Sequence, residues 1–474
     1  MKRLLTLAFL LVALTGFSQN PSGTARDFWH NPITLKLDKL RPVPTGGTQM
    51  IFPVPWGTGY KWGTVSLSEL LPGSGNTIYV STAYGNNATA EIGNPTKPYL
   101  TAASALSVYT VGNIINVLDG THSFTLTSDT INFIGNKGSQ IILSQADSTS
   151  YQNNVVTVVG DVVKLSNYNV SKNSKLTVDC DSLHTVGLYC KQGSRTTLNA
   201  INWSYTNAII LNPAVADTIK SIFTATALNA HMQGELFQSG SGGKNATANV
   251  TIGTLYTPAS GVGGGCIVNN YRATQDSISY NFKIGSIEGK GSTCGLVFMA
   301  PEELRVRGVV INFDIGTAIG LTNIVNGYAV SSNVATSVLI NVNIENYRLI
   351  GATDPPMDLG YAFKGVRIVL SGNYFIDSAV PFLKHWSGGD SPHVEFYGNY
   401  YINTTALIQA TKATTSAFFY FGNAKVIAVT AATPVVTASA ALNIFSSGLN
   451  TNSSGAWTNV TVVGVAALIN SSFK

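Results

Sequence analysis

The chain has 474 residues, only 11% of them charged, and a formal net charge of +5 at pH 7. An average soluble domain is about 25% charged, and this sequence contains no cluster of lysine and arginine. Nucleic acid is therefore not an expected partner. The length suits two or three ordinary domains or one long repeat domain. Abundant Gly, Ser, Thr and Asn are typical of a long all-β protein with an uncharged polar surface.

The first residues, MKRLLTLAFLLVALTGFSQ, have the parts of a secretory signal. Lys2 and Arg3 supply the positive charge, residues 4–14 form an apolar run, and Gly16 and Ser18 offer the small side chains that precede a cleavage site. The run is too short to span a bilayer comfortably, and no later stretch could do so. We expect residues 1–18 to direct export and the protein not to be an integral membrane protein. The alternative is an uncleaved apolar segment that anchors or packs at one end.

Residues 19–75 are rich in Pro, Gly and aromatic residues, and we expect a small N-terminal module there. The piece GTGYKWGTVSLSEL resembles modules that precede β-helices in bacteriophage tail-spike and tail-fibre proteins. That resemblance implies attachment to a larger particle or assembly into a homotrimer. A plain cap and linker is the alternative interpretation.

The next segment, NTIYVSTAYGNNATAEIGNPTKPYLTAASAL, begins at Asn76. Its strand, Gly/Asn-rich loop, Lys-Pro-Tyr-Leu-Thr step and short helix over 102–106 resemble the start of secreted proteins of the pectate-lyase-like superfamily, which are right-handed parallel β-helices. Asp119, Gly120 and Thr121 also fit this resemblance, whereas His122 stands where an aromatic residue is usual. The resemblance implies that the helix covers the open end of the apolar core. It says little about activity.

A five-residue pattern then recurs at intervals of 29 to 32 residues, as NVTIG, NFKIG, NFDIG and NVNIE. Each copy ends a segment of alternating apolar and polar residues, as β-strands with one buried face do. A fixed period of this length indicates a solenoid. The connecting segments are Gly-, Ser- and Asn-rich and lack amphipathic helices, which favours a parallel β-helix over a helix-containing solenoid. We expect side-chain amides to form a hydrogen-bonded ladder at Asn249, Asn281, Asn312 and Asn341.

The predicted fold is therefore all-β: a single right-handed parallel β-helix solenoid over residues 76–474, with a short N-terminal capping helix and the small N-terminal module before it. The four cysteines have no CxxC spacing and no accompanying histidine, so no metal site is expected. Cys266 and Cys294 are about one repeat apart and could stack as thiols or as a disulfide. Cys180 and Cys190 are also compatible with an oxidising compartment without proving one.

Candidate binding residues follow from the repeat. Two positions after the ladder asparagines, Lys283 and Asp314 should be stacked neighbours on the outer face, as part of a binding surface or as a plain surface ion pair. Extending the asparagine column gives Arg367 and then His393, with Glu395 two residues along. The adjoining stretch adds further candidate binding residues at Lys384, His385, Trp386, Asp390 and Tyr397.

This C-terminal set allows two functions. Arg367, His393 and Glu395 could supply the acid–base chemistry of a lyase, or the set could bind sugar through aromatic stacking and hydrogen bonds. The third interpretation is that Trp386 packs under a loop and the charges are merely solvated. Polygalacturonase-like enzymes would show Asn-Thr-Asp, Asp-Asp, Gly-His-Gly and Arg-x-Lys in order, and none is present.

We therefore expect a non-catalytic protein that displays a glycan-binding or cell-surface-binding face, as a tail spike, fibre or adhesin does, and that forms a homotrimer. Its location would be extracellular or in a virion, although virion proteins assembled in the cytoplasm need no export signal. The alternative is a secreted polysaccharide lyase or glycoside hydrolase. No cofactor is expected, with Ca²⁺ considered only for a lyase.

Overall fold

The computed structural model describes residues 49–56, 59–66, 76–453, 460–464 and 468–469, with gaps at 128–129, 146–151, 207–208, 212–218, 239–243, 258–265, 271–275, 290–294, 300–306, 328–335, 361–365, 386–392, 412–417, 431 and 440–441. The signal-like residues 1–18 and the predicted site residues Trp386 and Asp390 lie outside these ranges. The chain divides into two compact units, Met1–Thr77 and Ile78–Lys474. In the first unit, β1 (Gln49–Trp56) pairs antiparallel with β2 (Gly59–Ser66).

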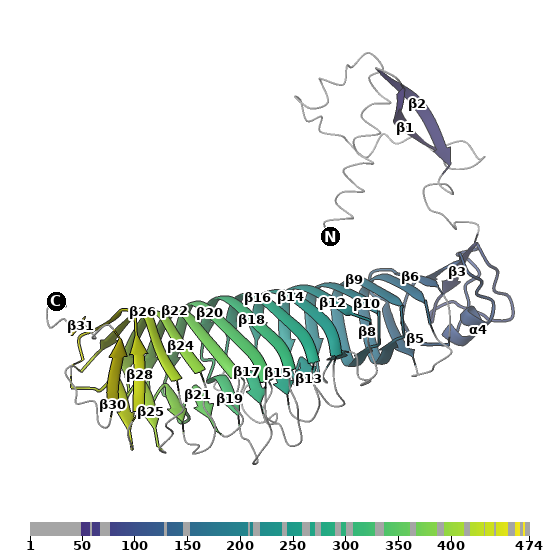
Figure 1. Ribbon diagram of the computed structural model, residues 1–474. Helices are drawn as coiled ribbons and strands as arrows, with labels where there is room; N and C mark the ends of the chain where they lie inside the picture. The colour runs from purple at the N-terminus through teal and green to yellow at the C-terminus, as the bar shows by residue number, and fades with distance from the viewer. Residues whose placement is uncertain are drawn as a thin grey trace. The chain divides into compact units, whose positions relative to one another are not determined.

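The second unit is a parallel β-helix built from stacked parallel strands, so the predicted fold is confirmed (Figure 1). Its turns contain a long strand that bends in the middle, so that its first half belongs to one sheet and its second half to another. These long strands are β8 (Val155–Val170), β9 (Lys175–Cys190), β10 (Arg195–Tyr205), β12 (Ser221–Met232), β14 (Lys244–Tyr256), β16 (Asp276–Glu288), β18 (Arg307–Ile319), β20 (Thr336–Ile350), β22 (Val366–Asp377), β24 (His393–Asn403) and β26 (Phe418–Ala428).

At both ends of the stack the two halves are separate strands. At the N-terminal end, β6 pairs with the first half of β8 and β7 pairs with its second half. At the C-terminal end, β28 pairs with the first half of β26 and β29 pairs with its second half. These strands are β3 (Thr77–Val80), β4 (Ile114–Val117), β5 (Thr121–Leu126), β6 (Ile131–Gly135), β7 (Gln140–Gln145), β28 (Leu442–Ser446), β29 (Leu449–Thr451), β30 (Val460–Gly464) and β31 (Leu468–Ile469). We refer to the first halves as the first sheet and to the second halves as the second sheet.

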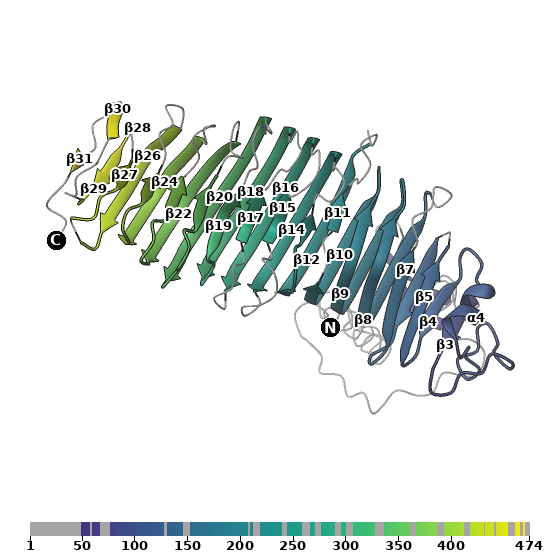
Figure 2. The ribbon, with the colours of Figure 1, turned by 90° about the horizontal axis from the view of Figure 1, so that it is seen from below.

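Short strands between successive long strands form a third sheet, which lies below the long strands in Figure 1; Figure 2 shows the stack from below. They run in parallel pairs along the stack, beginning on the end of β9. They are β11 (Ile209–Leu211), β13 (Phe237–Gln238), β15 (Cys266–Asn270), β17 (Gly295–Met299), β19 (Asn323–Gly327), β21 (Met357–Leu359), β23 (Leu383–His385), β25 (Ile408–Ala410) and β27 (Val436–Ala438). Three sheets thus surround one apolar core.

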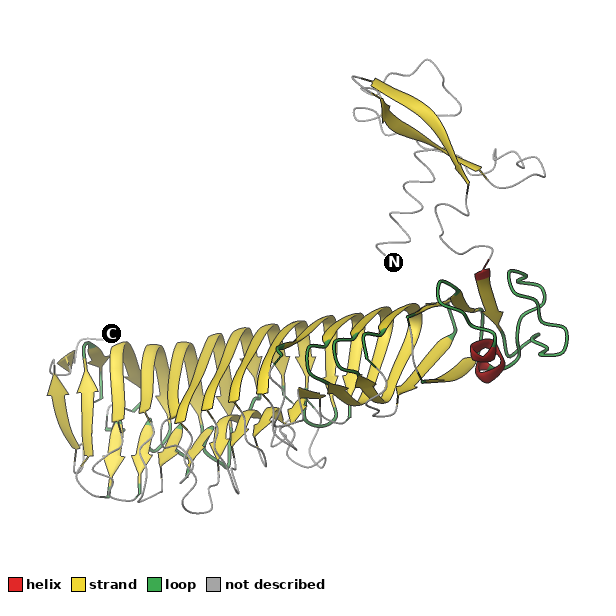
Figure 3. Ribbon diagram, turned by 45° about the vertical axis from the view of Figure 1, so that its right-hand side comes forward, coloured by secondary structure: helices red, strands yellow, loops and turns green. Residues whose placement is uncertain are grey.

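The predicted capping helix is α4 (Ala102–Ser107), which lies at the N-terminal end of the stack (Figure 3). Thr101 caps it by accepting a hydrogen bond from the backbone N–H of Ser104 at 3.2 Å. Such a cap satisfies a backbone donor that has no partner within the helix. Asp119 fixes the start of the loop between β3 and α4, because its carboxylate accepts hydrogen bonds from the backbone N–H groups of Thr82 and Ala83. Ala102 and Ala105 are buried against the core.

The structure explains each part of the repeated pattern. Asn281, Asn312 and Asn341 each donate a side-chain amide hydrogen bond to the asparagine of the preceding turn, at 3.0, 2.8 and 2.8 Å, so the predicted ladder is confirmed. The final glycine lies at the bend of the long strand. A Cβ at Gly285 or Gly316 would stand 2.6 Å from the carbonyl oxygen of the preceding turn's glycine. Only glycine permits this approach of neighbouring backbones.

The apolar positions of the alternating segments all face the core, as predicted. Equivalent positions on successive turns lie about 4.8 Å apart, which allows aromatic rings to stack. Phe282 stacks on Phe313 with ring centroids 4.7 Å apart, and Tyr374 stacks on Tyr400 at 4.9 Å. Offset stacking of this kind adds to the stability gained from burial. In the described part of the chain, no helix is long and apolar enough to cross a membrane.

Candidate functional site

The asparagine column continues into the C-terminal turns, but not through the predicted residues. Asn341 pairs with Val369 of β22, and Val369 pairs with Glu395 of β24. Arg367 pairs instead with Leu339 and with His393, which places both predicted residues one outward-facing position before the column. The prediction that Arg367 and His393 extend the column was therefore wrong. The error arose because β22 and β24 have no asparagine at the column position, so their sequences gave no shared residue with which to align them to β20.

Glu395 is the centre of a compact polar cluster on the outer face of the first sheet. Arg367 donates to both carboxylate oxygens, from Nε at 2.7 Å and from Nη2 at 3.0 Å. Tyr397 donates its hydroxyl to Oε2 at 2.9 Å. His393 Nε2 lies 2.8 Å from Oε1, although not in line for a directed hydrogen bond. The structure thus brings three of the predicted residues, Arg367, His393 and Tyr397, together around the carboxylate of a fourth, Glu395.

The environment of Glu395 keeps its carboxylate charged. Only 6% of its side chain is exposed, and this burial acts to raise its pKa. The hydrogen bonds from Arg367 and Tyr397 and the positive charge of Arg367 outweigh burial, so the pKa lies below its usual value. The pKa of Arg367 is raised, chiefly by its hydrogen bonds to Glu395. Burial lowers the pKa of His393, so its imidazole is neutral at pH 7.

Aromatic rings extend this cluster toward the C-terminus. The His393 ring meets the Phe418 ring edge-on at 4.2 Å, and Phe418 stacks on Phe445 at 4.4 Å. The Tyr397 ring lies over Gly422, and a Cβ at this position would overlap the ring, so glycine makes room for it. The aromatic packing and the bidentate ion pair hold Glu395 and its partners in one arrangement.

The remaining predicted residues lie elsewhere. Lys283 and Asp314 are register neighbours on β16 and β18, as predicted, and Asp314 accepts a hydrogen bond from Asn343 at 3.0 Å. Lys384 and His385 belong to β23 of the third sheet rather than to the cluster. His385 is fully buried, with Nδ1 3.1 Å from the carbonyl oxygen of Leu359, so it does not reach the surface as a glycan-binding residue would.

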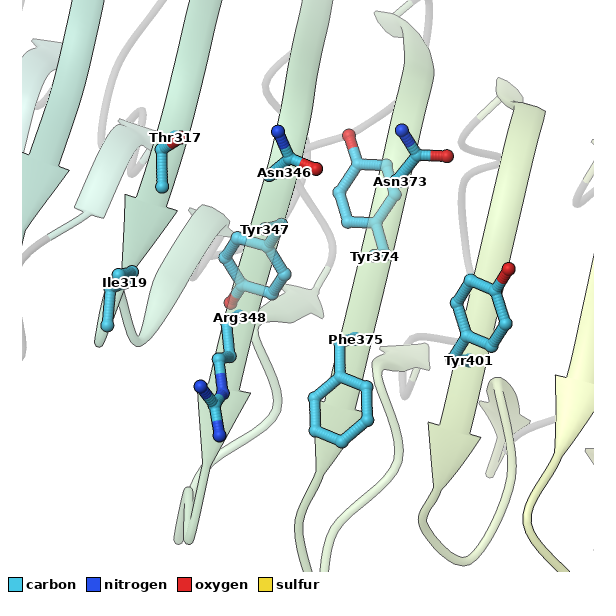
Figure 4. A pocket seen from close by; sticks show the side chains of 9 residues that line it. All are labelled: Thr317, Ile319, Asn346, Tyr347, Arg348, Asn373, Tyr374, Phe375 and Tyr401. Carbon is cyan, nitrogen blue, oxygen red and sulfur yellow. The ribbon is translucent and has the colours of Figure 1, made fainter.

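Sequence reasoning missed a groove on the outer face of the second sheet, which Figure 4 shows. Two rows of outward side chains border it and cross the strands from β18 to β24. The groove has a volume of about 420 Å³, within the range of small-molecule sites. The polar row consists of Thr317, Asn346 and Asn373 and continues beyond the groove to Asn399, and the second row consists of Ile319, Arg348, Phe375 and Tyr401.

The second row offers flat apolar surfaces beside a cation. Ile319, Phe375 and Tyr401 are 51%, 41% and 39% exposed, although such side chains are usually buried. The guanidinium of Arg348 lies over the Phe375 ring, 5.8 Å from its centroid, where a cation–π attraction holds it in place. Arg348 and the two rings therefore form a preassembled surface on three successive turns.

The polar row is fixed by its own hydrogen bonds. Asn399 donates to Asn373 at 2.7 Å, and Asn373 donates to the carbonyl oxygen of Glu345 at 2.7 Å. An irregularity between Ile344 and Tyr347 shifts the register of β20 against β22 at this point. Such bulges redirect side chains and often lie beside functional sites. The groove could have been found from the sequences NYR, NYF and NYY at 346–348, 373–375 and 399–401, because alternation points the residue after each tyrosine outward.

The described residues offer neither a metal-binding cluster nor a reactive thiol. No group of three or more His, Cys, Asp or Glu side chains lies close enough to hold a metal ion there. Burial raises the pKa of the Cys180 and Cys190 thiols to about 12, which makes both poor nucleophiles. Cys266 is buried and pairs in register with Gly295, and Cys294 lies outside the described residues. Comparisons with models of protein families, with curated proteins and with solved structures found no match for this chain.

Proposed function

We propose that this protein binds a glycan in the groove of the second sheet, with Phe375 and Tyr401 as stacking surfaces. The observation that carries the proposal is the exposure of these two rings on adjacent turns, beside Arg348. A pyranose ring has an apolar C–H face and a polar rim. The apolar face packs on an aromatic ring and removes both from water, while the rim hydroxyls require hydrogen-bond donors and acceptors.

The polar row supplies those partners. The side chains of Thr317 and Asn346 lie beside the aromatic row, and an amide can both donate and accept. A polymer whose repeat matches the distance of about 4.8 Å between turns could use equivalent positions on successive strands. The groove is open along the sheet, which suits a chain better than a small enclosed ligand.

The Glu395 cluster supports a lyase less well. A lyase needs a base that can lose and regain a proton near neutral pH. Arg367 is a cation at every such pH, and its hydrogen bonds to Glu395 raise its pKa further. The imidazole of His393 lies against Glu395 and the Phe418 ring. The carboxylate of Glu395 is occupied by Arg367 and Tyr397. The cluster therefore resembles a structural brace more closely than an acid–base site.

The proposal includes an extracellular or virion location and a homotrimer, as a tail spike, fibre or adhesin would have. The support for these parts is the signal-like segment 1–18 and the tail-fibre-like piece of residues 19–75. Sedimentation equilibrium of the purified protein would measure the oligomeric state, and a monomer would contradict the trimer.

The test uses purified protein and a panel of neutral and acidic polysaccharides. Affinity electrophoresis reports retention, size-exclusion chromatography reports chain length, and absorbance near 235 nm reports unsaturated lyase products. We expect at least one polymer to retard the protein without being shortened. Tyr401→Ala should weaken retention about tenfold or more, since a buried aromatic contact contributes about 1–3 kcal/mol.

Phe418→Ala is the matched control, because it removes an aromatic ring from the Glu395 cluster on the other sheet. Equal loss in the two variants would contradict a site in the groove. Shortening of a polymer that Arg367→Ala or His393→Ala abolishes would favour the lyase instead. Absence of retention by every polymer would overturn the proposed function.

A further inference from the structure

A second hollow, of about 290 Å³, opens on the outer face of the second sheet over β8 to β12. Its walls include Ser204 and His184, which are register partners on adjacent turns. Ser204 Oγ lies 2.5 Å from His184 Nδ1. In the tautomer with its hydrogen on Nε2, the imidazole accepts this hydrogen bond and the serine hydroxyl donates it. A serine that donates to a neutral imidazole is the pairing that activates a nucleophile.

The surroundings favour that protonation state. Burial lowers the pKa of His184, and the charge of Lys164 on the preceding turn lowers it further. The imidazole is therefore neutral at pH 7 and can accept a proton. On the other side of Ser204 lies His231, whose ring stacks on Tyr256 at 4.8 Å. Lys164 and His231 are the titratable neighbours of the pair along this row.

An amide donor stands next to the pair. Asn202 precedes Ser204 by two residues on β10, so the two share the outer face, and Asn202 also lines the hollow. Its Oδ1 accepts a hydrogen bond from Asn229 at 3.1 Å, which leaves its NH₂ group to donate elsewhere. Such a donor can stabilise the oxyanion that forms when a hydroxyl attacks a carbonyl group.

The hollow and the groove occupy the same two rows of the second sheet. Ser204, His231 and Arg348 belong to one row of register partners, which runs across the successive long strands from β10 to β20. The parallel row leads from Asn202 to Asn346. About six turns separate His184 from Arg348, or roughly 29 Å at 4.8 Å per turn. A polymer held in the groove and following these rows would pass over Ser204.

We propose that Ser204 is a nucleophile, with His184 as its general base, that hydrolyses O-acyl esters carried on a glycan. Ser204 Oγ attacks the carbonyl carbon while its proton passes to His184 Nδ1. The tetrahedral intermediate expels the sugar hydroxyl, which takes the proton from His184. Water then attacks the acyl-serine carbonyl carbon and gives a proton to His184. The bond between the acyl carbon and Ser204 Oγ breaks, Oγ takes the proton back from His184, and a carboxylic acid is released. The proposal rests on the proposed function only for the source of the ester.

The first test needs no glycan. Full-length protein is treated with a fluorophosphonate, and the adduct is measured by intact mass and located by peptide mapping. We expect one adduct on Ser204, none in Ser204→Ala, and labelling at least tenfold slower in His184→Ala, because general-base catalysis contributes about 100-fold or more. Ser279→Ala is the matched control, since Ser279 is a half-buried outer-face serine beside an amide, Asn281, rather than an imidazole.

The pH profile of the wild-type protein tests the pair without any variant. Labelling should rise through the pKa of His184, which lies below 6.5, and stay level from pH 7 to pH 8. A rate that climbs tenfold per pH unit over that range would show an ordinary serine and overturn the proposal, as would an adduct at another residue. Acetate release from an acetylated polymer, lost in Ser204→Ala, would support the ester substrate. Ser204 labelling without release from an acetylated polymer that the protein retains would overturn ester hydrolysis while leaving the glycan-binding function intact.

Discussion

The same column of the first sheet behaves differently in two regions of the molecule. From β14 to β20 it carries only asparagine, and each amide after the first donates to the one before it. From β22 to β28 it carries Val369, Glu395, Tyr420 and Phe445 in turn. In the first region one side chain is repeated, and in the second every turn has its own residue.

The difference shows how a solenoid separates register from recognition. A repeated amide satisfies its polar groups with its own kind, which fixes the register of successive strands but leaves little to distinguish one turn from the next. Where the residue changes on every turn, the surface acquires specific contacts, such as the bidentate ion pair of Arg367 with Glu395. The groove of the second sheet crosses from the last uniform turns, β18 and β20, to the varied turns of β22 and β24.

The largest effect should come from the strand bend of the varied region. Gly372 has φ of +117°, and a Cβ there would stand 1.8 Å from the carbonyl oxygen of Ile344. We expect Gly372→Ala to lower the free energy of unfolding by about 3 kcal/mol or more, because both strain and overlap oppose it. Gly160→Ala is the control, since the same change at the bend of β8 meets its nearest atom at 3.5 Å. Urea unfolding measures both, and equal stability would contradict the packing described for the bend.

A smaller, pH-dependent effect is expected at Glu395. Because its folded pKa is depressed, the charged carboxylate stabilises the protein above its unfolded pKa of about 4.3, and this stabilisation is lost as pH falls through the folded value. Glu395→Gln should therefore cost about 1.5–3 kcal/mol at pH 7 and progressively less below pH 4. Urea unfolding of both proteins from pH 3 to pH 7 measures the difference. A difference that is the same at every pH would show that the carboxylate charge contributes nothing.

The smallest effect is expected within the uniform ladder. Asn312→Ala removes one amide that both donates and accepts along the column, and hydrogen bonds between neutral groups contribute about 1 kcal/mol each. We expect a loss of about 1–2 kcal/mol in urea unfolding and unchanged glycan retention. Loss of retention in this variant would show that the ladder is part of a binding surface.

The sequence predicted the features that repeat and missed those that do not. The Asn-x-x-Ile pattern led directly to the strands, the core face and the ladder, because each copy confirmed the alignment of the others. The register beyond Asn341 could not be predicted for two reasons. The bulge in β20 shifts the pairing by an amount that the sequence does not show, and β22 has no asparagine at the column position that aligned the earlier strands. Arg367, His393, Glu395 and Tyr397 were nevertheless correctly grouped, because they are close along two consecutive strands.

The groove and the Ser204–His184 pair were missed for another reason. The Ser204–His184 pair depends on side chains from two turns that share no motif, so only the register brings them together. The groove has a short shared pattern, Asn-Tyr followed by an outward residue, but this pattern lies after the strand bend rather than at the ladder, and it covers only three of the groove's turns. Tyr401 and Phe375 also look like core residues in the sequence, since aromatic residues in strands are usually buried. Their exposure became visible only when the faces of each strand were fixed.

The most direct test of glycan binding in the groove is hydroxyl-radical footprinting of the protein with and without a polymer that it retains. We predict protection of Phe375 and Tyr401, while Tyr84, which is 57% exposed and lies near the N-terminal end of the stack, remains unchanged. Protection of Phe418 and Tyr420 instead, with the groove unchanged, would contradict the central claim and place the glycan on the first sheet.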